Sequence, residues 1–468
     1  MVGNINYTVI YVLAIVIILI LESTVEGFSP SLSTLRNVQH NRIPHLRSTN
    51  GDADAKLPAK EKRQQTTSHE SVQARAGRLG GGSDELTTTL EHFGDTAARK
   101  RVLILCTGGT LTMSNDPSQG GSLAPVQGAL TKYLQNMREF TDDPEMPEIV
   151  SHEYTPLIDS SDMGPGDWAL IAEDIAENYY YFDGFVVLMG TDTMAYAASA
   201  LSFMFQNLGK PVVFTGSQIP LREPYNDARK NLIMAVIFAS SDTVSEVTIF
   251  FHDRLIRACR ATKVNTSKLL AFDSPNIEPL AEIGINIEER DHLYLPPPRG
   301  AFRVRTEMDT RLITLRLVPG FDDTCIIHMI KAARETHLKG LILQLYGTGN
   351  MPSLKDDLVH ALSDATAAGV CVVVTTQCHT GSVLLGHYAT GQALIKAGTV
   401  SAGDMTLEAA TAKLAYLLGR GDLKIDEVRD LMGVDLRGEL TPKDQISPPP
   451  LASSYQKAIF QKNRSRTY

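Results

Sequence analysis

Three kinds of reactive side chain follow apolar, strand-like runs in this 468-residue chain. Thr110 ends the segment TGGT (Thr107–Thr110), Thr191 and Asp192 stand together in GTDT, and Lys263 ends RATK. A threonine hydroxyl is too weakly acidic to attack an amide alone, so it needs a base that removes its proton. A lysine held against a carboxylate at a buried site could be that base. These residues are therefore candidates for nucleophilic catalysis.

A fourth segment, PLIDSSDM, groups carboxylates and hydroxyls in a different way. Asp159, Ser160 and Ser161 follow a predicted strand at 149–154. Side chains of these types, packed this closely, suit the ammonium and carboxylate groups of an amino acid. The segment also fits a turn in which an aspartate caps the helix near Trp168, and the sequence leaves both interpretations open.

The glycine–threonine segments have structural interpretations as well. TGGT fits an ordinary turn from a strand to a helix, and Asp192 or Thr193 could cap a helix that begins at Met194. TGGT lacks the GK[ST] ending of a phosphate-binding loop and does not complete GxGxxG. Two strands that each end in a Gly-Thr corner nevertheless favour one shared site over two unrelated turns.

Short apolar runs rich in β-branched residues predict the strands that position these segments. They are Val102–Cys106, Phe185–Met189, Pro211–Gly216 and Val247–Phe251. Such runs fit strands buried on both faces of a parallel sheet, and helix-period stretches lie between them. This alternation predicts a doubly wound α/β domain, in which ligands bind at the carboxyl edge of the strands.

A break in the pattern divides the chain into two unequal domains. Three consecutive prolines in LYLPPPRG exclude a helix or a central strand at 293–300 and indicate a linker. A second alternation of strand-like and helix-like segments follows the linker. The predicted parts are a larger N-terminal α/β domain with a doubly wound, mostly parallel sheet at 99–290, a linker at 291–310, a smaller C-terminal α/β domain at 311–445 and a tail at 446–468.

The N-terminus carries an unbroken apolar run from Val9 to Leu21, shorter than the roughly 20 residues that span a bilayer. Small residues after it predict a signal peptide at 1–27, and an uncleaved anchor is the alternative. Residues 28–98 are polar and begin with a Ser-, Thr- and Arg-containing stretch without acids, which predicts a transit-like, disordered linker. We expect passage into the secretory pathway, with either a plastid or the exterior or endomembrane lumen as destination. No stable membrane insertion of the mature chain is expected.

Composition restricts the partners and the cofactors. The formal net charge of -9 argues against a nucleic-acid-binding surface, and the hydrophobic content of 43% is that of an ordinary globular protein. Five cysteines, an odd number without a CxxC pair, indicate thiols rather than disulfides or a zinc site. No cluster has metal-ligand spacing, so neither a metal nor another cofactor is expected.

Taken together, the segments resemble the bacterial-type L-asparaginase family, and its cytoplasmic type I branch in particular. The resemblance runs from about Lys100 to about Lys443 and rests on TGGT, PLIDSSDM, GFVVLMGTDTMAYAASALSFM, KPVVFTGSQIPL, RATK and RGELTP, in this order. It implies two unequal α/β domains and hydrolysis of L-asparagine to L-aspartate and ammonia through a covalent β-aspartyl-enzyme. It also implies a homodimer or homotetramer whose active sites are completed at subunit contacts.

The resemblance assigns roles residue by residue. Thr110 would be the nucleophile. Thr191, Asp192 and Lys263 would form a second group that supports the attack and orients the water for deacylation. The residues that would hold the substrate are Asp159, Ser160, Ser161 and Gly190. Backbone N–H groups at the two threonine corners are the expected oxyanion donors.

One family feature is missing from its usual place. Some members carry a tyrosine on a mobile lid shortly after the first threonine, whereas LTMSNDPSQGGSLAP contains none. Tyr388, in GHYATG of the second domain, is our candidate for that catalytic role. The alternative for Tyr388 is a packed core tyrosine.

Two other functions stay open at this point. The asparaginase-like subunit of a tRNA-dependent amidotransferase shares both threonine corners, but it would bring an RNA-handling domain and a partner subunit. The acidic charge and the polar extension before Lys100 do not favour it. A non-catalytic amino-acid-binding module could keep DSSD and lose the relay, and the presence of Thr110, Thr191, Asp192 and Lys263 argues against it.

Overall fold

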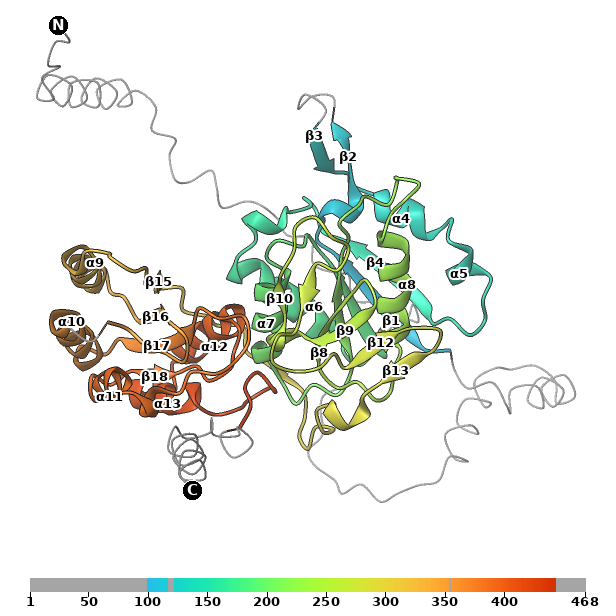
Figure 1. Cartoon of the computed structure of the whole chain (residues 1–468). Helices are drawn as coiled ribbons and strands as arrows, with labels where there is room; N and C mark the ends of the chain where they lie inside the picture. Colours follow the sequence, from blue (N-terminus) through green and yellow to red (C-terminus); the bar gives the residue numbers. More distant parts are fainter. Residues whose placement is uncertain (1–98, 117–121, 353–354, 443–468) are drawn as a thin grey trace, which may run out of the picture. The chain divides into compact units, whose positions relative to one another are not determined.

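The computed structural model describes residues 99–116, 122–352 and 355–442 (Figure 1). The signal peptide predicted at 1–27, the transit-like linker predicted at 28–98 and the predicted tail at 446–468 lie outside these residues. None of the helices in the described ranges is long and apolar enough to cross a membrane.

A sheet of eight strands forms the centre of the larger domain, in the order β13-β12-β9-β8-β7-β5-β1-β4. Neighbours from β4 through β1, β5 and β7 to β8 pair in parallel, and the other pairs are antiparallel. Side chains of β1 and β5 are buried on both faces, as their unbroken apolar runs predict. The strands are β1 (Arg101–Cys106), β4 (Glu148–Glu153), β5 (Gly184–Leu188), β7 (Val212–Thr215), β8 (Val247–Phe251), β9 (Arg254–Arg257), β12 (Ala281–Ile283) and β13 (Ile287–Glu289).

Helices cover both faces of this sheet, so the predicted doubly wound architecture is confirmed. On one face, Leu103 and Phe185 pack with α6 and α7 in one buried cluster. On the other face, Ile104 and Val186 pack with α4 and α8 in a second cluster. Neighbouring residues of a strand thus enter opposite clusters, as pleating requires. The helices are α4 (Ala129–Leu134), α5 (Arg138–Thr141), α6 (Pro165–Asn178), α7 (Met194–Met204) and α8 (Ala228–Ala239).

The smaller domain has its own parallel sheet in the order β15-β16-β17-β18, which confirms the second α/β domain. Helices α9 and α10 share a buried cluster with this sheet. Helices α12 and α13 join the cluster that also contains α7, where the rings of Phe203 and Tyr416 stack with centroids 6.2 Å apart. The elements are β15 (Leu312–Arg316), α9 (Asp323–Glu335), β16 (Gly340–Leu345), α10 (Asp356–Ala367), β17 (Cys371–Thr376), α11 (Ala389–Lys396), β18 (Val400–Ser401), α12 (Leu407–Gly419) and α13 (Ile425–Met432).

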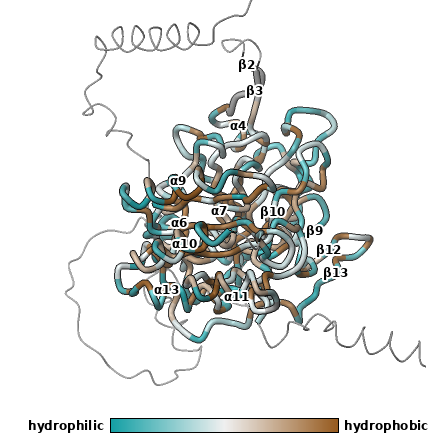
Figure 2. The backbone as a smooth tube through the Cα atoms, turned by 60° about the vertical axis from the view of Figure 1, so that its left-hand side comes forward, coloured by the Kyte–Doolittle hydropathy of each residue, from teal (hydrophilic) through white to brown (hydrophobic). Residues whose placement is uncertain are grey.

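Short elements connect these layers. Three antiparallel pairs are β2 (Met113–Asp116) with β3 (Ser122–Pro125), β6 (Phe205–Gln206) with β14 (Arg303–Val304), and β10 (Thr262–Lys263) with β11 (Phe272–Asp273). The 3-10 turns are η1 (Thr110–Thr112), η3 (Ser160–Asp162), η4 (Ala258–Arg260), η5 (Asp291–Leu293) and η6 (Leu385–His387). Hydrophobic stretches of the backbone run through the interior, and hydrophilic stretches lie on the connecting loops (Figure 2).

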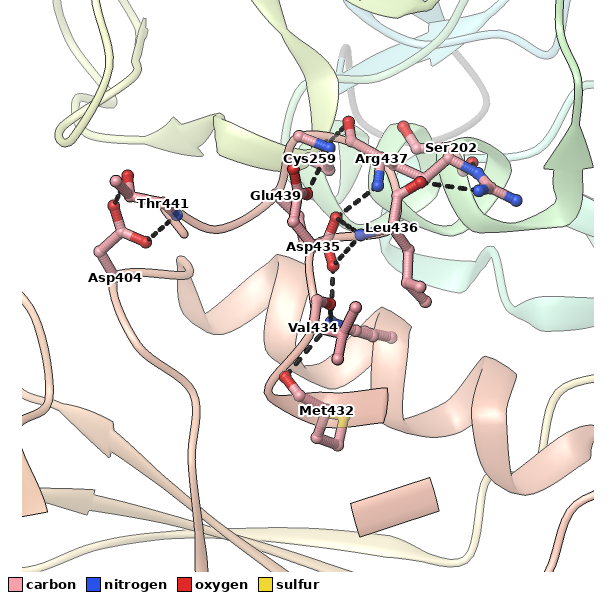
Figure 3. Close-up of polar contacts among 12 residues, drawn as sticks. Ser202, Cys259, Asp404, Met432, Val434, Asp435, Leu436, Arg437, Glu439 and Thr441 are labelled. Carbon is pink, nitrogen blue, oxygen red and sulfur yellow. Dashed lines mark hydrogen bonds and ion pairs between the residues drawn. The ribbon is translucent and has the colours of Figure 1, made fainter. Parts of the chain in front are cut away.

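A buried ion pair lies inside the smaller domain. Lys413 of α12 and Glu439 have no solvent exposure, and Lys413 Nζ lies 2.6 Å from Glu439 Oε1. Lys413 also donates to the carbonyl oxygens of Met432 and Val434, at 3.2 and 2.5 Å. Asp435 lies beside Glu439 (Figure 3), and burial together with the Glu439 charge raises the pKa of Asp435 to about 6. Lys413 is therefore the direct ion-pair partner of Glu439 in a region that holds two carboxyl groups.

Replacing this lysine tests the energetic role of the pair. Lys413→Met is expected to lower the free energy of unfolding by about 3–5 kcal/mol near neutral pH, because it leaves a buried carboxylate without its cation. Burial raises the pKa of Glu439, but Lys413 outweighs burial and holds it below its usual value. Without Lys413 that pKa rises in the folded state, so the deficit should shrink as pH falls through the raised value. Urea unfolding at two pH values measures both effects.

The exposed Lys424 at the start of α13 provides the control. Lys424→Met removes the same charge and should leave the free energy of unfolding within about 0.5 kcal/mol of the wild type. Equal stabilities of the Lys413 and Lys424 variants would contradict the role given to the buried pair.

Candidate active site

Three neighbouring strands of the larger sheet lead into the loops with most of the predicted site residues. Strands β4, β1 and β5 are adjacent and parallel. Their carboxyl ends therefore lie at one edge of the sheet, where ligands bind in folds of this kind. Residues 107–110 follow β1, residues 154–162 follow β4, and residues 189–193 follow β5.

The three loops touch through glycines. A Cβ at Gly109 would lie 2.5 Å from the Gly190 Cα, and a Cβ at Gly190 would lie 2.5 Å from the Ser160 Oγ. A Cβ at Gly108 would lie 2.9 Å from the Ile158 carbonyl oxygen. Real Cβ atoms essentially never approach other atoms this closely. The glycines therefore allow three backbones to meet where any side chain would separate them.

Thr110 begins the 3-10 turn η1 directly after this contact. Gly109 has a φ of 87°, a left-handed conformation that favours glycine, and its carbonyl oxygen accepts from the Thr112 backbone N–H at 3.1 Å. The next residue, Leu111, accepts a hydrogen bond from the Leu221 backbone N–H at 3.2 Å. The backbone on both sides of Thr110 is thus fixed by neighbours in the fold.

Lys263 contacts both candidate residues of the β5 loop. Its Nζ donates to Thr191 Oγ1 and to Asp192 Oδ1, each at 2.7 Å. The Lys263 side chain is only 15% exposed, whereas that of Asp192 is 69% exposed. An amine placed between a hydroxyl and a carboxylate can exchange a proton with the hydroxyl while the carboxylate compensates its charge. The arrangement is suited to a proton relay.

The β4 loop holds its carboxylate in a defined orientation. Asp159 Oδ1 accepts from the Ser161 backbone N–H at 2.9 Å and from the Ser161 hydroxyl at 2.8 Å. Asp159 therefore caps the short turn η3, which is the turn interpretation of this segment. It does not cap α6, the helix that contains Trp168. The residue at the N-cap of that helix is Gly164, and its backbone N–H donates to the Asp167 carboxylate.

Thr193 links the β5 loop to the β4 loop. It is the residue before α7, but its side chain makes no capping hydrogen bond to that helix. The hydroxyl instead donates to the Ser160 carbonyl oxygen at 2.6 Å. The helix-cap interpretation of Thr193 is therefore wrong, and the residue contributes to the assembly of the site.

Sequence reasoning assigned no site residue to the loop after β7, although it is the next strand beside β5. A Cβ at Gly216 would lie 2.5 Å from the Met189 carbonyl oxygen. Ser217 follows, 1% exposed, and its hydroxyl has no hydrogen-bond partner among the described residues. The signal that could have found this loop was topological, since its strand ends at the same edge as the other three.

Tyr388 is not among the residues that meet here. It precedes α11 in the smaller domain, its side chain is 55% exposed, and α11 packs mainly against η6 and α10. The alternative of a packed core tyrosine is therefore wrong for the single chain. The catalytic role stays a prediction.

Cys106, the last residue of β1, is not a candidate nucleophile. Burial raises the pKa of the Cys106 thiol to about 12, so the thiol stays protonated and is a poor nucleophile. Within the ranges that the structure describes, no three His, Cys, Asp or Glu residues are grouped to hold a metal ion. The side chains described above supply hydroxyl, amine and carboxylate groups to this edge.

The chain matches two protein-family models. "Asparaginase, N-terminal" matches residues 101–294, and "Glutaminase/Asparaginase C-terminal domain" matches residues 311–432. L-asparaginase 1 of Escherichia coli K12 is 45% identical over 346 residues, which cover 74% of this chain and 99% of that protein. A 60 kDa lysophospholipase of Mus musculus is 38% identical over 363 residues, which cover 73% of this chain and 63% of that protein.

A solved structure is similar in three dimensions as well. The crystal structure of L-asparaginase I from Vibrio cholerae matches with a TM-score of 0.66 and 44% sequence identity. The match covers 74% of this chain and all of that chain, so the likeness extends over both domains.

The glycine contact can be tested by its energetic cost. Gly109→Ala should lower the free energy of unfolding by about 1–3 kcal/mol more than Gly369→Ala, since overpacking adds this cost to the backbone strain that both variants share. Gly369 is the matched control because its φ of 88° is nearly the same and a Cβ there would meet nothing within 4 Å. Urea unfolding of both variants gives the difference, and equal costs would refute the close approach.

Proposed function

This chain belongs to the bacterial-type L-asparaginase family, and from that membership we propose that it hydrolyses L-asparagine to L-aspartate and ammonia with a threonine nucleophile. One observation carries the proposal. Lys263 Nζ lies 2.7 Å from both Thr191 Oγ1 and Asp192 Oδ1. These two residues belong to the loop whose Gly190 touches Gly109, the residue before Thr110. Nucleophile and proton relay are thereby held at one edge of the sheet.

In the first half-reaction, the Thr110 hydroxyl oxygen forms a bond to the side-chain amide carbon of asparagine. The proton of the hydroxyl passes to the relay of Thr191 and Lys263. The amide nitrogen takes up a proton, its bond to carbon breaks, and ammonia leaves. Asp192 balances the charge of Lys263 while the amine gains and loses its proton. The product is a β-aspartyl ester of Thr110.

In the second half-reaction, water attacks the ester carbonyl carbon and gives a proton to the same relay. The bond between carbon and the Thr110 oxygen breaks, this oxygen regains a proton, and L-aspartate leaves. Both tetrahedral intermediates carry a negative oxygen. Backbone N–H groups beside Thr110 and Thr191 are the natural donors to it, because the glycine contact fixes them before the substrate arrives.

The β4 loop is suited to holding the amino-acid end of the substrate. Asp159 supplies the carboxylate that an α-ammonium group requires, and Ser161 already fixes its orientation through two hydrogen bonds. The Ser160 hydroxyl supplies a polar hydrogen for the α-carboxylate, and Ser161 serves the same site by holding Asp159. Gly190 tolerates no side chain against Ser160, so the β5 loop can lie directly against the loop that would hold the substrate.

The alternatives have less support. A binding module without catalysis gives no reason for an amine between Thr191 and Asp192. An amidotransferase subunit would need an RNA-handling domain, whereas the match spans 99% of the Escherichia coli asparaginase. The sequence has no G-x-S-x-G segment, so the lipid hydrolysis named for the mouse relative lacks the usual serine nucleophile elbow.

We also propose a homodimer or homotetramer as the active assembly. Tyr388 is exposed in the single chain and lies in the smaller domain, whereas Thr110 lies in the larger one. A second copy of the chain is the arrangement that would let it complete a site. Near-wild-type turnover of Tyr388→Phe would remove this argument for a catalytic tyrosine.

Substitution of the nucleophile and of the relay tests the reaction. Thr110→Ala and Lys263→Met should each lower the rate of ammonia release from L-asparagine by about 10³-fold or more, because each removes a group that acts in the transition state. Lys268→Met, five positions after Lys263 and exposed, is the matched control and should keep full activity. A folded wild type that releases no ammonia would refute the proposed function.

Removal of the substrate's ammonium group tests the β4 loop. Asp159→Asn should raise KM for L-asparagine about 10–100-fold, since a charged hydrogen bond contributes about 1.5–3 kcal/mol. The same variant should change kcat/KM little for succinamate, which is asparagine without the α-amino group. Steady-state kinetics with both substrates decide, and an equal loss for both would show that Asp159 does not bind the ammonium group.

A further inference from the structure

The segment 258–263, which ends at Lys263, is tied to the smaller domain. Cys259 Sγ donates to the Arg437 carbonyl oxygen at 3.4 Å. Arg437 Nε in turn donates to the Ser202 carbonyl oxygen in the last turn of α7, at 2.9 Å (Figure 3). Arg437, in the chain that follows α13, is therefore bonded both to the segment 258–263 and to α7 of the larger domain.

Arg260 is the centre of the strongest contact. It is 3% exposed, and its Nη1 donates to Asp404 Oδ2 at 2.8 Å. Its Nε donates to the Gly438 carbonyl oxygen at 2.6 Å. Asp404 also accepts from the Thr441 backbone N–H and hydroxyl, at 2.8 and 2.6 Å (Figure 3). The arginine of RATK is thus bonded to the segment RGELTP. The two segments lie in contact in the fold although they are far apart in sequence.

Thr262, the residue before Lys263, makes a separate contact. Its hydroxyl donates to Glu408 Oε1 at 2.7 Å. Glu408 lies in the first turn of α12, whose Thr406 accepts from the Ala409 backbone N–H at 3.2 Å. Burial raises the pKa of the Glu408 carboxyl, and the Thr262 hydrogen bond opposes that rise. Because the Glu408 carboxyl is poorly hydrated, its hydrogen bond with Thr262 is stronger than the same bond would be in water.

The same helix α12 also packs against α7, where Tyr416 stacks on Phe203. Helix α7 begins at Met194, two residues after Asp192 and at the end of the loop that carries Thr191 and Asp192. One helix of the smaller domain therefore contacts both the helix that follows the Thr191–Asp192 loop and the strand that carries Lys263.

Strand geometry transmits the Thr262 contact to Lys263. Strand β10 has two residues, with Thr262 opposite Asp273 and Lys263 opposite Phe272 in β11. Successive side chains of a strand point in opposite directions. A fixed Thr262 side chain therefore fixes the direction in which the Lys263 side chain leaves the strand. A two-residue ladder has few hydrogen bonds of its own to fix this rotation.

We propose that Glu408 is a positioning residue for Lys263: through the Thr262 hydroxyl it fixes β10 and holds the lysine amine against Thr191 and Asp192. Glu408 bonds to Thr262 and Thr406 and to none of the reacting groups, so it acts through another residue. Its effect on turnover rests on the proposed function, whereas its effect on the placement of Lys263 does not.

The test uses the full chain and two pairs of variants. Glu408→Ala and Thr262→Val remove the hydrogen bond, whereas Glu408→Gln and Thr262→Ser keep an acceptor and a donor. Glu427→Ala is the matched control, because Glu427 is an exposed first-turn glutamate of α13 in the same domain. The two readouts are the kinetics of ammonia release and the acetylation of Lys263 by acetic anhydride, measured by mass spectrometry relative to the exposed Lys268.

The removing variants should lower kcat about 10–100-fold, the loss expected for a misplaced catalytic group. KM should change less than about threefold, because substrate binding is not touched. The ratio of Lys263 to Lys268 acetylation should rise severalfold, and the double variant Glu408→Ala, Thr262→Val should lose no more than either single one. Glu408→Gln, Thr262→Ser and Glu427→Ala should stay near the wild type.

Wild-type kcat and acetylation in both removing variants would overturn the proposal, and so would losses that multiply in the double variant. If Glu408→Ala does not fold, the pair Thr262→Val and Thr262→Ser decides alone. If the wild type releases no ammonia, the proposed function fails, and the acetylation ratio still decides whether Glu408 positions Lys263.

Discussion

The site depends on the close approach of two backbones at Gly109 and Gly190. Strands β1 and β5 are neighbours in a parallel sheet, so the loops that leave them start roughly 4.8 Å apart. Two glycines let these loops stay in contact beyond the last ladder hydrogen bond. Thr110 and Thr191 each follow one of the glycines by a single residue. Their relative placement is therefore set by the packing of the main chain.

This dependence explains why much of the site could be predicted from the sequence. Buried parallel strands leave unbroken apolar runs, and such runs locate β1, β5, β7 and β8. The polar segments that follow these runs start at the carboxyl ends of parallel strands. Their reactive side chains could therefore be assigned to one edge of the sheet before any contact was known. The contact of Lys263 with Asp192 was implied by the family resemblance, and the structure supplies its 2.7 Å distance.

The sequence could not predict which distant charges pair. Arg260 meets Asp404 and Lys413 meets Glu439 in the interior. Periodicity reports only whether a position faces the core, and a lysine in α12 carries no local mark of the carboxylate that lies beside it. The loop after β7 was missed for a related reason, because Ser217 is chemically ordinary and only the strand order shows where it lies. Tyr388 shows the opposite case: it was chosen because it is a tyrosine in the second domain, and residue type alone does not determine where a side chain lies in the fold.

The two domains have different tasks at one site. The larger domain supplies the hydroxyls, the carboxylates and the amine, and the smaller domain supplies buried partners for the segment that carries the amine. Apolar contacts alone would hold that segment down but would let it slide and rotate, because they have no direction. The hydrogen bonds of Arg260 and Thr262 are directional, and breaking one partner of a buried ion pair is costly. Directional contacts of this kind can hold the Lys263 amine in place, which a proton relay requires to within about 0.5 Å.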